Sequence, residues 1–238
     1  MAVKKTMITH LFFDFFGTLV EYSDSRTEQG YQNSHAVLLA NGSALSYQAF
    51  MEQWETSCDR FDVAAHATQD EYSMDASVAG FLNDVFGPDH SLELAKTFRN
   101  AYLQEWSKGV RDIDGVPELL KRLKHQYTLA LVTNTHSADY VHGHLRRMQI
   151  IEYFSLVVTS VEHGKRKPHP SIFQHALRTV GCESHNALYI GDTFTADYLG
   201  ANGVGMRCLL IDPRQKQNIR AEDRIADVLD MQRVLSLE

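Results

Sequence analysis

Short apolar runs recur along the chain and are separated by longer segments in which apolar residues return at helical spacing. The runs are rich in β-branched and aromatic residues, and polar residues or glycine bound them. Such runs are typical of strands that are buried on both faces of a sheet. They lie at residues 8–13, 127–133, 155–160, 186–191 and 206–211.

The segments between the later runs have the pattern of amphipathic helices. In residues 137–149, the apolar Val141, Leu145 and Met148 stand at i, i+4 and i+7. Residues 171–180 carry a similar apolar stripe, which is followed by glycine as a C-terminal cap. Strands that alternate with helices predict an α/β fold. We expect a Rossmann-like parallel sheet with right-handed crossovers and helices on both faces.

Residues 21–109 break this alternation. They contain no convincing buried strand, and short breaks such as Asn41-Gly42 and Gly87-Pro88 divide them into four predicted helices. These helices lie at about 26–40, 46–64, 71–86 and 91–107. An all-helical block directly after the first strand is interpreted as a cap domain at 21–109. The core domain would then comprise 1–20 and 110–238.

The composition excludes several classes of protein. Of 238 residues, 44% are hydrophobic and 22% are charged, which is the profile of a soluble globular protein. The net charge of −7, without a basic tract, argues against nucleic acid as a partner. No apolar run approaches the roughly 20 residues of a membrane helix. The three widely spaced cysteines, Cys58, Cys182 and Cys208, suit a reducing cytoplasm, which is the expected location.

Polar residues follow the predicted strands at the points where these strands end. In a parallel sheet such points meet at one edge, where ligands bind. From the first to the fourth strand, the residues expected there are Asp14, Thr18, Thr133, Asn134, Lys167, Asp192 and Asp197. Three carboxylates, a hydroxyl and a lysine would therefore converge.

Clustered carboxylates repel one another unless a cation lies between them. An all-oxygen set favours a hard cation such as Mg²⁺, and Asp14, Asp192 and Asp197 are its candidate ligands. A carboxylate beside the metal can also attack phosphorus and form an aspartyl-phosphate, which water then hydrolyses. Thr133 would donate to the phosphoryl oxygens, and Lys167 would offset negative charge. The pattern predicts a magnesium-dependent hydrolase whose nucleophile is Asp14.

Four segments resemble, in order, the motifs of the haloacid dehalogenase-like (HAD) superfamily. FFDFFGTL at 12–19 resembles its Asp-x-Asp-Gly-Thr motif except at one position. LVTN at 131–134 resembles the Ser/Thr motif, KPHPSIF at 167–173 the Lys-Pro motif, and GDTFTAD at 191–197 the Gly-Asp-x4-Asp motif. The helical insertion resembles the cap that this family places between its first two motifs. The resemblance covers essentially the whole chain and implies a HAD-like hydrolase.

The resemblance implies a role for each matching position. Asp14 would be the nucleophile, and the metal ligands would be Asp14, the backbone carbonyl of Phe16, Asp192 and, directly or through a metal-bound water, Asp197. The expected catalytic residues are Asp14, Thr133 and Lys167. The expected substrate-binding residues are Thr133, Asn134, Lys167 and Thr18. The substrate would be a small phosphorylated molecule.

Phe16 departs from the family's pattern. In the family's phosphomonoesterases this position holds an aspartate that protonates the leaving alcohol and then activates water, and a phenyl ring can do neither. General acid–base catalysis of this kind is worth roughly 10²–10⁴ in rate. The dehalogenase and phosphonate-cleaving branches lack this acid, so both reactions stay open, as does a feebly catalytic protein that binds a phosphorylated ligand. The retained Asp192 and Asp197 favour a metal and hence phosphorus chemistry.

The missing acid leaves three interpretations for a phosphatase. The leaving group is activated, as in an acyl phosphate; or a residue in or near the cap supplies the proton; or water alone supports slow turnover. The candidate donors are Asp24, Arg26, His35, Arg60 and His66, each of which is more simply interpreted as a solvated helix residue.

Overall fold

The computed structural model describes residues 7–23 and 29–235. The chain divides into two compact units. The first unit, called the α/β unit, comprises Met1–Glu21 and Asp112–Glu238. The second, called the insert, comprises Tyr22–Arg111.

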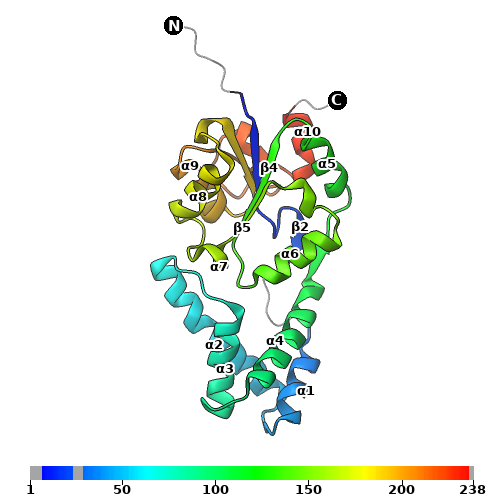
Figure 1. Ribbon diagram of the computed structural model, residues 1–238, viewed down its shortest axis with the longest axis vertical. Coiled ribbons are helices and arrows are strands. Elements are labelled where there is room, and N and C mark those ends of the chain that lie inside the picture. The colour runs from blue at the N-terminus through cyan, green and yellow to red at the C-terminus, as the bar shows by residue number, and fades with distance from the viewer. Residues whose placement is uncertain (1–6, 24–28, 236–238) are drawn as a thin grey trace. The chain divides into compact units, whose positions relative to one another are not determined.

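A six-stranded sheet forms the centre of the α/β unit (Figure 1). Its strands are β1 (His10–Phe13), β4 (Thr128–Thr133), β5 (Leu156–Thr159), β6 (Ala187–Gly191), β7 (Arg207–Ile211) and β8 (Arg224–Ile225). The strand order is β5-β4-β1-β6-β7-β8, and all neighbours are parallel. The α/β fold class predicted from the sequence is confirmed.

Helices connect these strands. They are α5 (Val116–Leu123), α6 (Ala138–Arg147), α7 (Ser160–His163), α8 (Pro170–Val180), α9 (Gly200–Gly203) and α10 (Met231–Val234). Short turns of 3₁₀-helix lie at Ile151–Tyr153, Ser184–Asn186, Ala221–Asp223 and Val228–Asp230, and a π-helical turn lies at Phe194–Leu199. Figure 1 shows α8 and α9 on one side of the sheet and α5 and α10 on the other.

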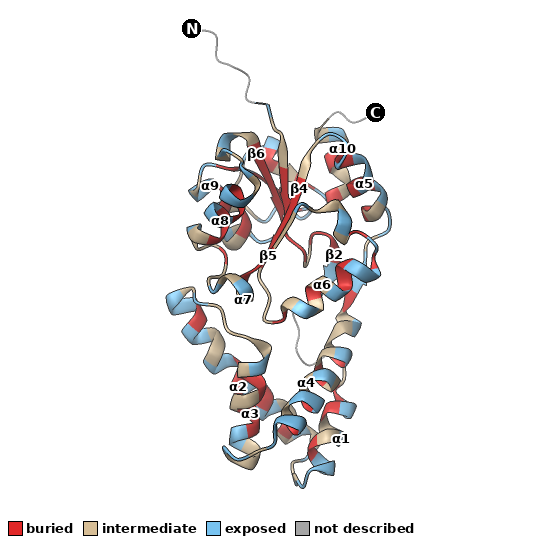
Figure 2. Cartoon of the chain, viewed as in Figure 1, coloured by how far each residue is buried: buried red, intermediate tan, exposed pale blue. Residues whose placement is uncertain are grey.

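The central strands are buried, as Figure 2 shows, because their residues on both faces of the sheet are apolar. On one face, Phe12, Ala130 and Tyr189 pack in a cluster with Phe173 and Ala176 of α8. The rings of Phe173 and Tyr189 meet edge to face, with centroids 5.4 Å apart. This packing fixes the sheet beneath the loops that follow its strands.

The register brings the carboxyl ends of the central strands to one level. Phe13 at the end of β1 pairs with Leu131 of β4 on one side and with Ile190 of β6 on the other. The N–H of Asp14 then donates to the carbonyl of Ile190 at 2.9 Å. Residues that directly follow β1, β4 and β6 therefore meet at one edge of the sheet.

The insert contains the helices α1 (Gln32–Ala40), α2 (Tyr47–Thr68), α3 (Met74–Phe86) and α4 (Leu92–Trp106), and then a 3₁₀ turn, Ser107–Gly109. Three of the four helices begin after a serine: Ser46, Ser73 and Ser91. Each serine hydroxyl accepts a hydrogen bond from the N–H three residues further on, as expected of an N-cap. Local sequence thus sets where these helices start.

Aromatic rings fill the core of the insert. Trp54 is fully buried, and its ring centroid lies 5.2 Å from that of Phe81 and 5.4 Å from that of Phe98. Both contacts bring ring edges toward ring faces, which is a favoured geometry. Burial of one such ring contributes about 1.5–3 kcal/mol. Apolar packing therefore holds the insert together.

Some local structure differs from the expectation. Two strands of three residues, β2 (Val20–Tyr22) and β3 (Val110–Asp112), form a separate two-stranded sheet that was not predicted, because so short a segment shows no periodicity. Of the helix expected at 26–40, the described part begins at Gln32.

All three cysteines are free thiols. Within residues 7–23 and 29–235, no helix combines the length and hydrophobicity needed to cross a membrane.

Candidate active site

Asp14 is the first residue after β1 and opens a tight turn. Its side chain is largely buried. In this turn Gly17 has a φ of 72°, a conformation that favours glycine, and its N–H donates to the carbonyl of Val20 at 2.9 Å. A side chain at position 17 would also collide with the carboxylate of Asp192. Gly17 therefore lets the turn after β1 approach the loop after β6.

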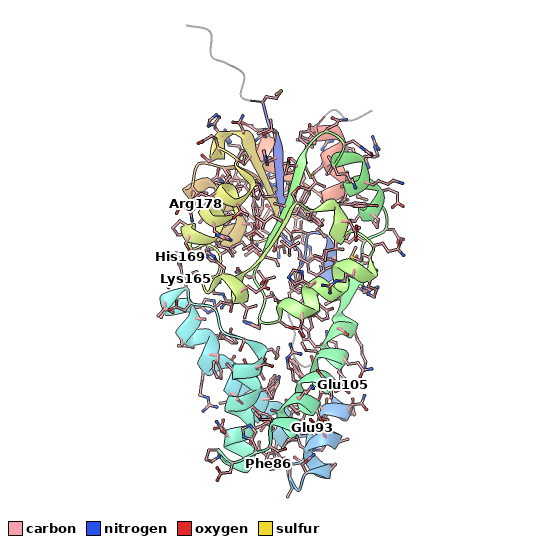
Figure 3. All side chains as sticks on the ribbon, in the orientation of Figure 1. Phe86, Glu93, Glu105, Lys165, His169 and Arg178 are labelled. Carbon is pink, nitrogen blue, oxygen red and sulfur yellow. The ribbon has the colours of Figure 1, made fainter. Side chains whose placement is uncertain are left out.

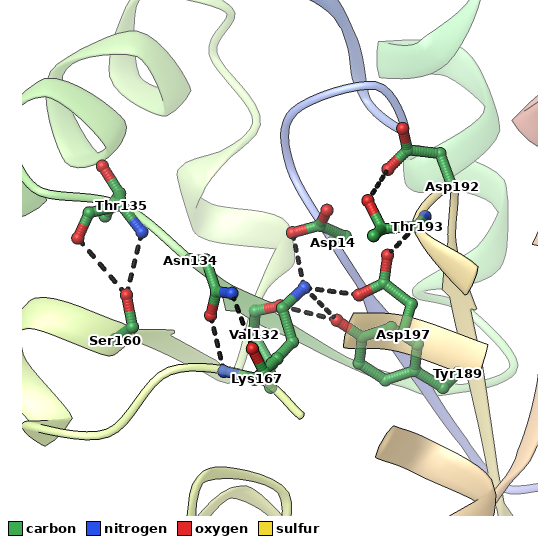
Figure 4. Close-up of polar contacts among 10 residues, drawn as sticks. All are labelled: Asp14, Val132, Asn134, Thr135, Ser160, Lys167, Tyr189, Asp192, Thr193 and Asp197. Carbon is green, nitrogen blue, oxygen red and sulfur yellow. Dashed lines mark hydrogen bonds and ion pairs between the residues drawn. The ribbon is translucent and has the colours of Figure 1, made fainter. Parts of the chain in front are cut away.

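The ammonium group of Lys167 lies at the centre of the candidate site (Figure 4). Its Nζ is 2.8 Å from Asp14 Oδ1 and 2.6 Å from Asp197 Oδ1, and it donates to the Tyr189 hydroxyl at 2.8 Å. Burial alone would lower the pKa of Lys167. The carboxylates of Asp14 and Asp197 outweigh burial and hold this pKa above its ordinary value. Lys167 is thus a fixed positive charge between two carboxylates.

Asn134 ties the Lys167 loop to the end of β4. The N–H of Lys167 donates to Asn134 Oδ1 at 2.7 Å, and Asn134 Nδ2 donates to the carbonyl of Lys167 at 3.0 Å (Figure 4). These bonds give the Asn134 amide a positioning role toward Lys167. Its expected contact with substrate stays a prediction.

Three carboxylates meet at the ends of β1 and β6. One oxygen from each of Asp14, Asp192 and Asp197 lies within 4.8 Å of the other two. Asp197 belongs to the π-helical turn, and its Oδ2 accepts the N–H of Thr193 at 2.9 Å. Gly191 leaves room for it, because a side chain at position 191 would collide with Asp197. Residues far apart in the sequence thus form one acidic cluster.

The acidic cluster carries more negative charge than Lys167 neutralises. The pKa of Asp192 is raised to about 7: although solvent reaches this side chain, the surrounding protein desolvates its carboxylate, and Asp14 and Asp197 add repulsion. The pKa of Asp197 is raised to about 6, first by burial and also by Asp14, against the opposing charge of Lys167. A divalent cation would relieve this repulsion. The oxygen donors fit Mg²⁺.

Two buried threonine hydroxyls, Thr133 Oγ1 and Thr18 Oγ1, have no hydrogen-bond partner among the described residues. A buried polar group left unpaired costs roughly 1–3 kcal/mol. Thr133 ends β4, which neighbours β1, so its hydroxyl is available to an anionic ligand beside Asp14. The expected contact of Thr18 with substrate stays a prediction.

Phe16 lies in a group of stacked and edge-on rings. Its centroid is 4.9 Å from that of Phe15 and 6.3 Å from that of Tyr140, whose ring is tilted by only 16° relative to it. The Tyr140 hydroxyl is hydrogen-bonded to His144 Nδ1 at 3.3 Å, and His144 Nε2 lies 2.9 Å from Asp112 Oδ1. Burial raises the pKa of Tyr140 to about 12. Phe16, the second residue after Asp14, is therefore stacked on the ring of Tyr140.

Sequence patterns did not single out Tyr189 or Tyr140. Tyr189 lies within a fully buried strand, where it looks like an ordinary core residue, yet its hydroxyl bridges Lys167 Nζ and the carbonyl of Val132. Tyr140 falls on α6, outside the four motif segments. Only the pairing of β1 with its neighbours and the packing of α6 bring these residues to the site.

The candidate proton donors of the insert have structural partners where they are described. Asp24 and Arg26 lie outside the described residues. His35 Nε2 is 2.7 Å from the carbonyl of Leu45, and His66 Nδ1 is 2.7 Å from the carbonyl of Asp62. Arg60 donates to Ser57 Oγ at 3.0 Å and pairs with Asp84. These contacts explain each side chain without a catalytic role.

The arrangement suits attack on an anionic electrophile. It combines a carboxylate oxygen as a nucleophile, a fixed cation beside it, and an unpaired hydroxyl that can donate to developing charge. The remaining carboxylates offer a site for a cation. A phosphoryl group, with its charged oxygens, matches all three features.

Known proteins resemble this chain in sequence. A family model for haloacid dehalogenase-like hydrolases matches residues 38–211, which is well over half of the chain. The chain is also 30% identical, over 140 residues, to ribulose-1,5-bisphosphate 5-phosphatase of Halopiger xanaduensis. That match covers 58% of this chain and 57% of the relative, so the chain spans little more than half of the relative's length.

Two solved structures share the fold. One is a 2-haloacid dehalogenase from Pseudomonas syringae pv. Tomato, with a TM-score of 0.74 and 20% identity, covering 97% of this chain and 99% of the other. The second is the magnesium-bound HAD-hydrolase YfnB from Bacillus subtilis, with a TM-score of 0.68 and 18% identity, covering 97% and 100%. At such identities the likeness concerns the fold alone.

Proposed function

The chain belongs to the haloacid dehalogenase-like hydrolase family, and we propose that it is a Mg²⁺-dependent phosphatase that forms an aspartyl-phosphate on Asp14. Its substrate is a small phosphorylated metabolite. The observation that carries the proposal is the convergence of Asp14, Asp192 and Asp197 around Lys167. The phosphatase at 30% identity supports the same reaction class.

In the proposed reaction, a carboxylate oxygen of Asp14 bonds to phosphorus while the bond from phosphorus to the leaving oxygen breaks. Lys167 holds the nucleophile in place and offsets negative charge, and Thr133 donates its unpaired hydroxyl to a phosphoryl oxygen. Water then hydrolyses the aspartyl-phosphate, which releases phosphate and restores the Asp14 carboxylate.

Asp14, Asp192 and the backbone carbonyl of Phe16 would hold Mg²⁺. Both Asp197 oxygens already accept hydrogen bonds, from Lys167 and from the N–H of Thr193, which favours orientation of a water over direct ligation. When bound, the cation adds positive charge that stabilises the charge on the transferring group. The magnesium-bound relative of the same fold is consistent with such a site.

The insert is proposed to act as a cap that selects the substrate, with the boundaries given above of 21–109 for the cap and 1–20 with 110–238 for the core. Caps close over active sites, exclude water and contact the leaving group. The insert has its own aromatic core, so it can change as a unit without altering the sheet that positions Asp14.

Phosphate release from a panel of phosphomonoesters and acyl phosphates tests the proposal. Each compound is assayed with Mg²⁺ and again with the metal chelated, for the wild type and for Asp14→Asn. We expect release that needs both Mg²⁺ and Asp14. Release that persists in Asp14→Asn would remove the nucleophile assignment, and release that persists without metal would remove the Mg²⁺ assignment.

One observation favours a second candidate, 2-haloacid dehalogenation: Phe16 supplies no proton, and a departing halide needs none. In that reaction Asp14 would attack carbon, and no metal would be required. The acidic cluster argues against it. Without a metal ion, the negative charges of Asp192 and Asp197, whose pKa values are raised, would have no bound cation to balance them. Metal-independent chloride release from 2-chloropropionate, without phosphate release from any ester, would favour the dehalogenase.

A further inference from the structure

The side chains that follow Asp14 on its own turn are aromatic. Phe15 and Phe16 are in edge-to-face contact, and the ring of Tyr140 is stacked on Phe16. Phe16 is also held close to the reacting edge, because the next residue, Gly17, touches the Asp192 carboxylate so closely that no side chain fits. A phenyl ring carries no exchangeable proton. The turn therefore offers the leaving group an apolar surface.

The protons of Lys167 and Tyr189 beside Asp14 are already committed to other bonds. Lys167 Nζ bridges Asp14, Asp197 and Tyr189, and the Tyr189 hydroxyl donates to the carbonyl of Val132 at 2.7 Å. Removal of a proton from Lys167 would leave two buried carboxylates unneutralised, which is costly.

Tyr140 carries a hydroxyl in this group of rings, and that hydroxyl is bonded to His144 Nδ1. His144 is in turn fixed by Asp112, and Arg147 donates to both oxygens of Asp112, at 3.0 and 2.8 Å. The polar end of Tyr140 thus belongs to a hydrogen-bonded network that runs through His144 to Asp112 and Arg147. Its ring, and not its hydroxyl, backs Phe16.

We propose that the physiological substrate is an acyl phosphate, a mixed anhydride of a carboxylic acid and phosphoric acid, which rests on the phosphatase function proposed above. A carboxylate leaves as a stable anion and takes the electron pair of the broken phosphorus–oxygen bond without needing a proton. An alkoxide from a sugar phosphate needs that proton. Asp14 gains the phosphoryl group, and hydrolysis returns the Asp14 carboxylate, leaving the protons of water on the released phosphate.

The dependence of kcat/KM on the leaving group tests this proposal, using the full chain with Mg²⁺. The probes are 2,4-dinitrophenyl phosphate, acetyl phosphate, 4-nitrophenyl and phenyl phosphate, and glycerol phosphate, in order of increasing basicity of the leaving oxygen. The rate of Asp14→Asn is subtracted for each probe, because the first two hydrolyse unaided. We expect kcat/KM to fall steeply along the series, with glycerol phosphate poorer than acetyl phosphate by at least roughly 10², the usual worth of an absent general acid.

Two matched variants identify the cause of the slope. Phe16→Asp introduces a carboxyl group, and we expect it to raise kcat/KM for phenyl and glycerol phosphate by roughly 10² while flattening the slope. Phe16→Asn has the same shape without an acid, and we expect it to keep the steep slope. We also expect Tyr140→Phe to keep the steep slope, whereas a further loss on the basic leaving groups would identify Tyr140 as a proton donor and overturn the proposal.

The outcomes separate this inference from the proposed function. A flat series in the wild type, dependent on Mg²⁺ and Asp14, would overturn the acyl phosphate inference and leave the phosphatase in place, with the acid supplied elsewhere, for example by the cap. No release above the Asp14→Asn background from any probe, acetyl phosphate included, would overturn both.

Discussion

The α/β unit and the insert both contain buried charged side chains. They differ in whether each of these charges has its hydrogen-bond and ion-pair partners. Among the described residues of the insert, Glu105 on α4 is the one buried charged side chain (Figure 3). Its carboxylate accepts the N–H of Asn33 at 2.8 Å and both the N–H and the hydroxyl of Ser34 at 2.9 and 2.7 Å. These donors lie at the start of α1, whose first N–H groups lack helical partners. Glu105 is a helix cap with its partners in place.

In the α/β unit, buried carboxylates fall into two groups. Asp223 resembles Glu105, because Arg207, Arg220 and the Tyr198 hydroxyl all contact it. The cluster around Asp14 is different: a single ammonium serves several carboxylates, two of which have raised pKa values, and the hydroxyl of Thr133 nearby has no partner among the described residues. The candidate active site therefore differs from the structural sites in that its buried polar and charged groups lack a full set of partners in the part of the chain that the structure describes.

The largest expected effect comes from Asp14→Asn, which removes the nucleophile and keeps its shape. We expect Mg²⁺-dependent phosphate release to fall by roughly 10⁴–10⁶, the range found when a reacting group is removed. The unfolding transition should change little, because Lys167 keeps Asp197 as a partner. The measurement pairs phosphate release with urea unfolding, and Asp89→Asn at an exposed position of the insert is the control. Comparable losses of activity in both variants would contradict the assignment.

Lys167→Met keeps the length of the side chain but removes the cation between Asp14 and Asp197. A buried pair broken on one side costs about 3–5 kcal/mol of unfolding free energy. Because Mg²⁺ replaces part of the lost positive charge, we expect it to stabilise the variant more than the wild type. Urea unfolding with and without Mg²⁺ measures both effects, with the exposed Lys121→Met as the control. If Mg²⁺ stabilised Lys167→Met and the wild type equally, the charge of Lys167 would be independent of the metal site.

Glu105→Ala tests the other half of the comparison. It leaves the donors of Asn33 and Ser34 without an acceptor, and we expect a loss of about 2 kcal/mol, as for hydrogen bonds to a charged group. The stabilisation by Mg²⁺ should stay that of the wild type. The exposed Gln104→Ala on the same helix is the matched control for unfolding. A changed Mg²⁺ response would show that Glu105 is more than a cap.

The acidic cluster could be predicted from the sequence because its residues follow the ends of predicted strands. Each of Asp14, Thr133 and Asp192 stands at or directly after the end of a buried apolar run, and parallel pairing brings such positions together without further information. The fold class follows from the same runs and from the helices between them.

Contacts set by tertiary packing were not predictable in this way. The amide of Asn134 is joined to the backbone of Lys167, 33 residues away, and Tyr189 bridges two strands from within the core. The ring of Tyr140 reaches Phe16 only through the packing of α6. Such contacts depend on register and helix packing, to which neither periodicity nor motif spacing is sensitive.

A substitution of His144 is expected to have the smallest effect on stability. His144 connects the Asp112–Arg147 ion pair, which has its partners, to Tyr140 beside Phe16 in the candidate site. Burial lowers the pKa of His144, the charge of Arg147 adds to this, and Asp112 opposes it. The unfolded chain therefore takes up a proton at the ordinary pKa of 6.5, before the folded chain does.

It follows that the stabilising contribution of neutral His144 is complete above pH 6.5 and is lost as the pH falls from there to the lowered pKa of the folded state. His144→Gln keeps a polar side chain that does not titrate, so its stability should fall less across this window. The difference between the urea unfolding curves of wild type and variant, followed from above pH 6.5 to well below it, isolates this contribution from those of His10 and His163, whose pKa values are also lowered. Parallel curves would mean that the pKa of His144 is the same in the folded and unfolded chain. A wild type that gains stability relative to the variant as the pH falls would mean that Asp112 keeps His144 charged in the folded state, and the network beside Phe16 would then hold a proton within reach of Tyr140.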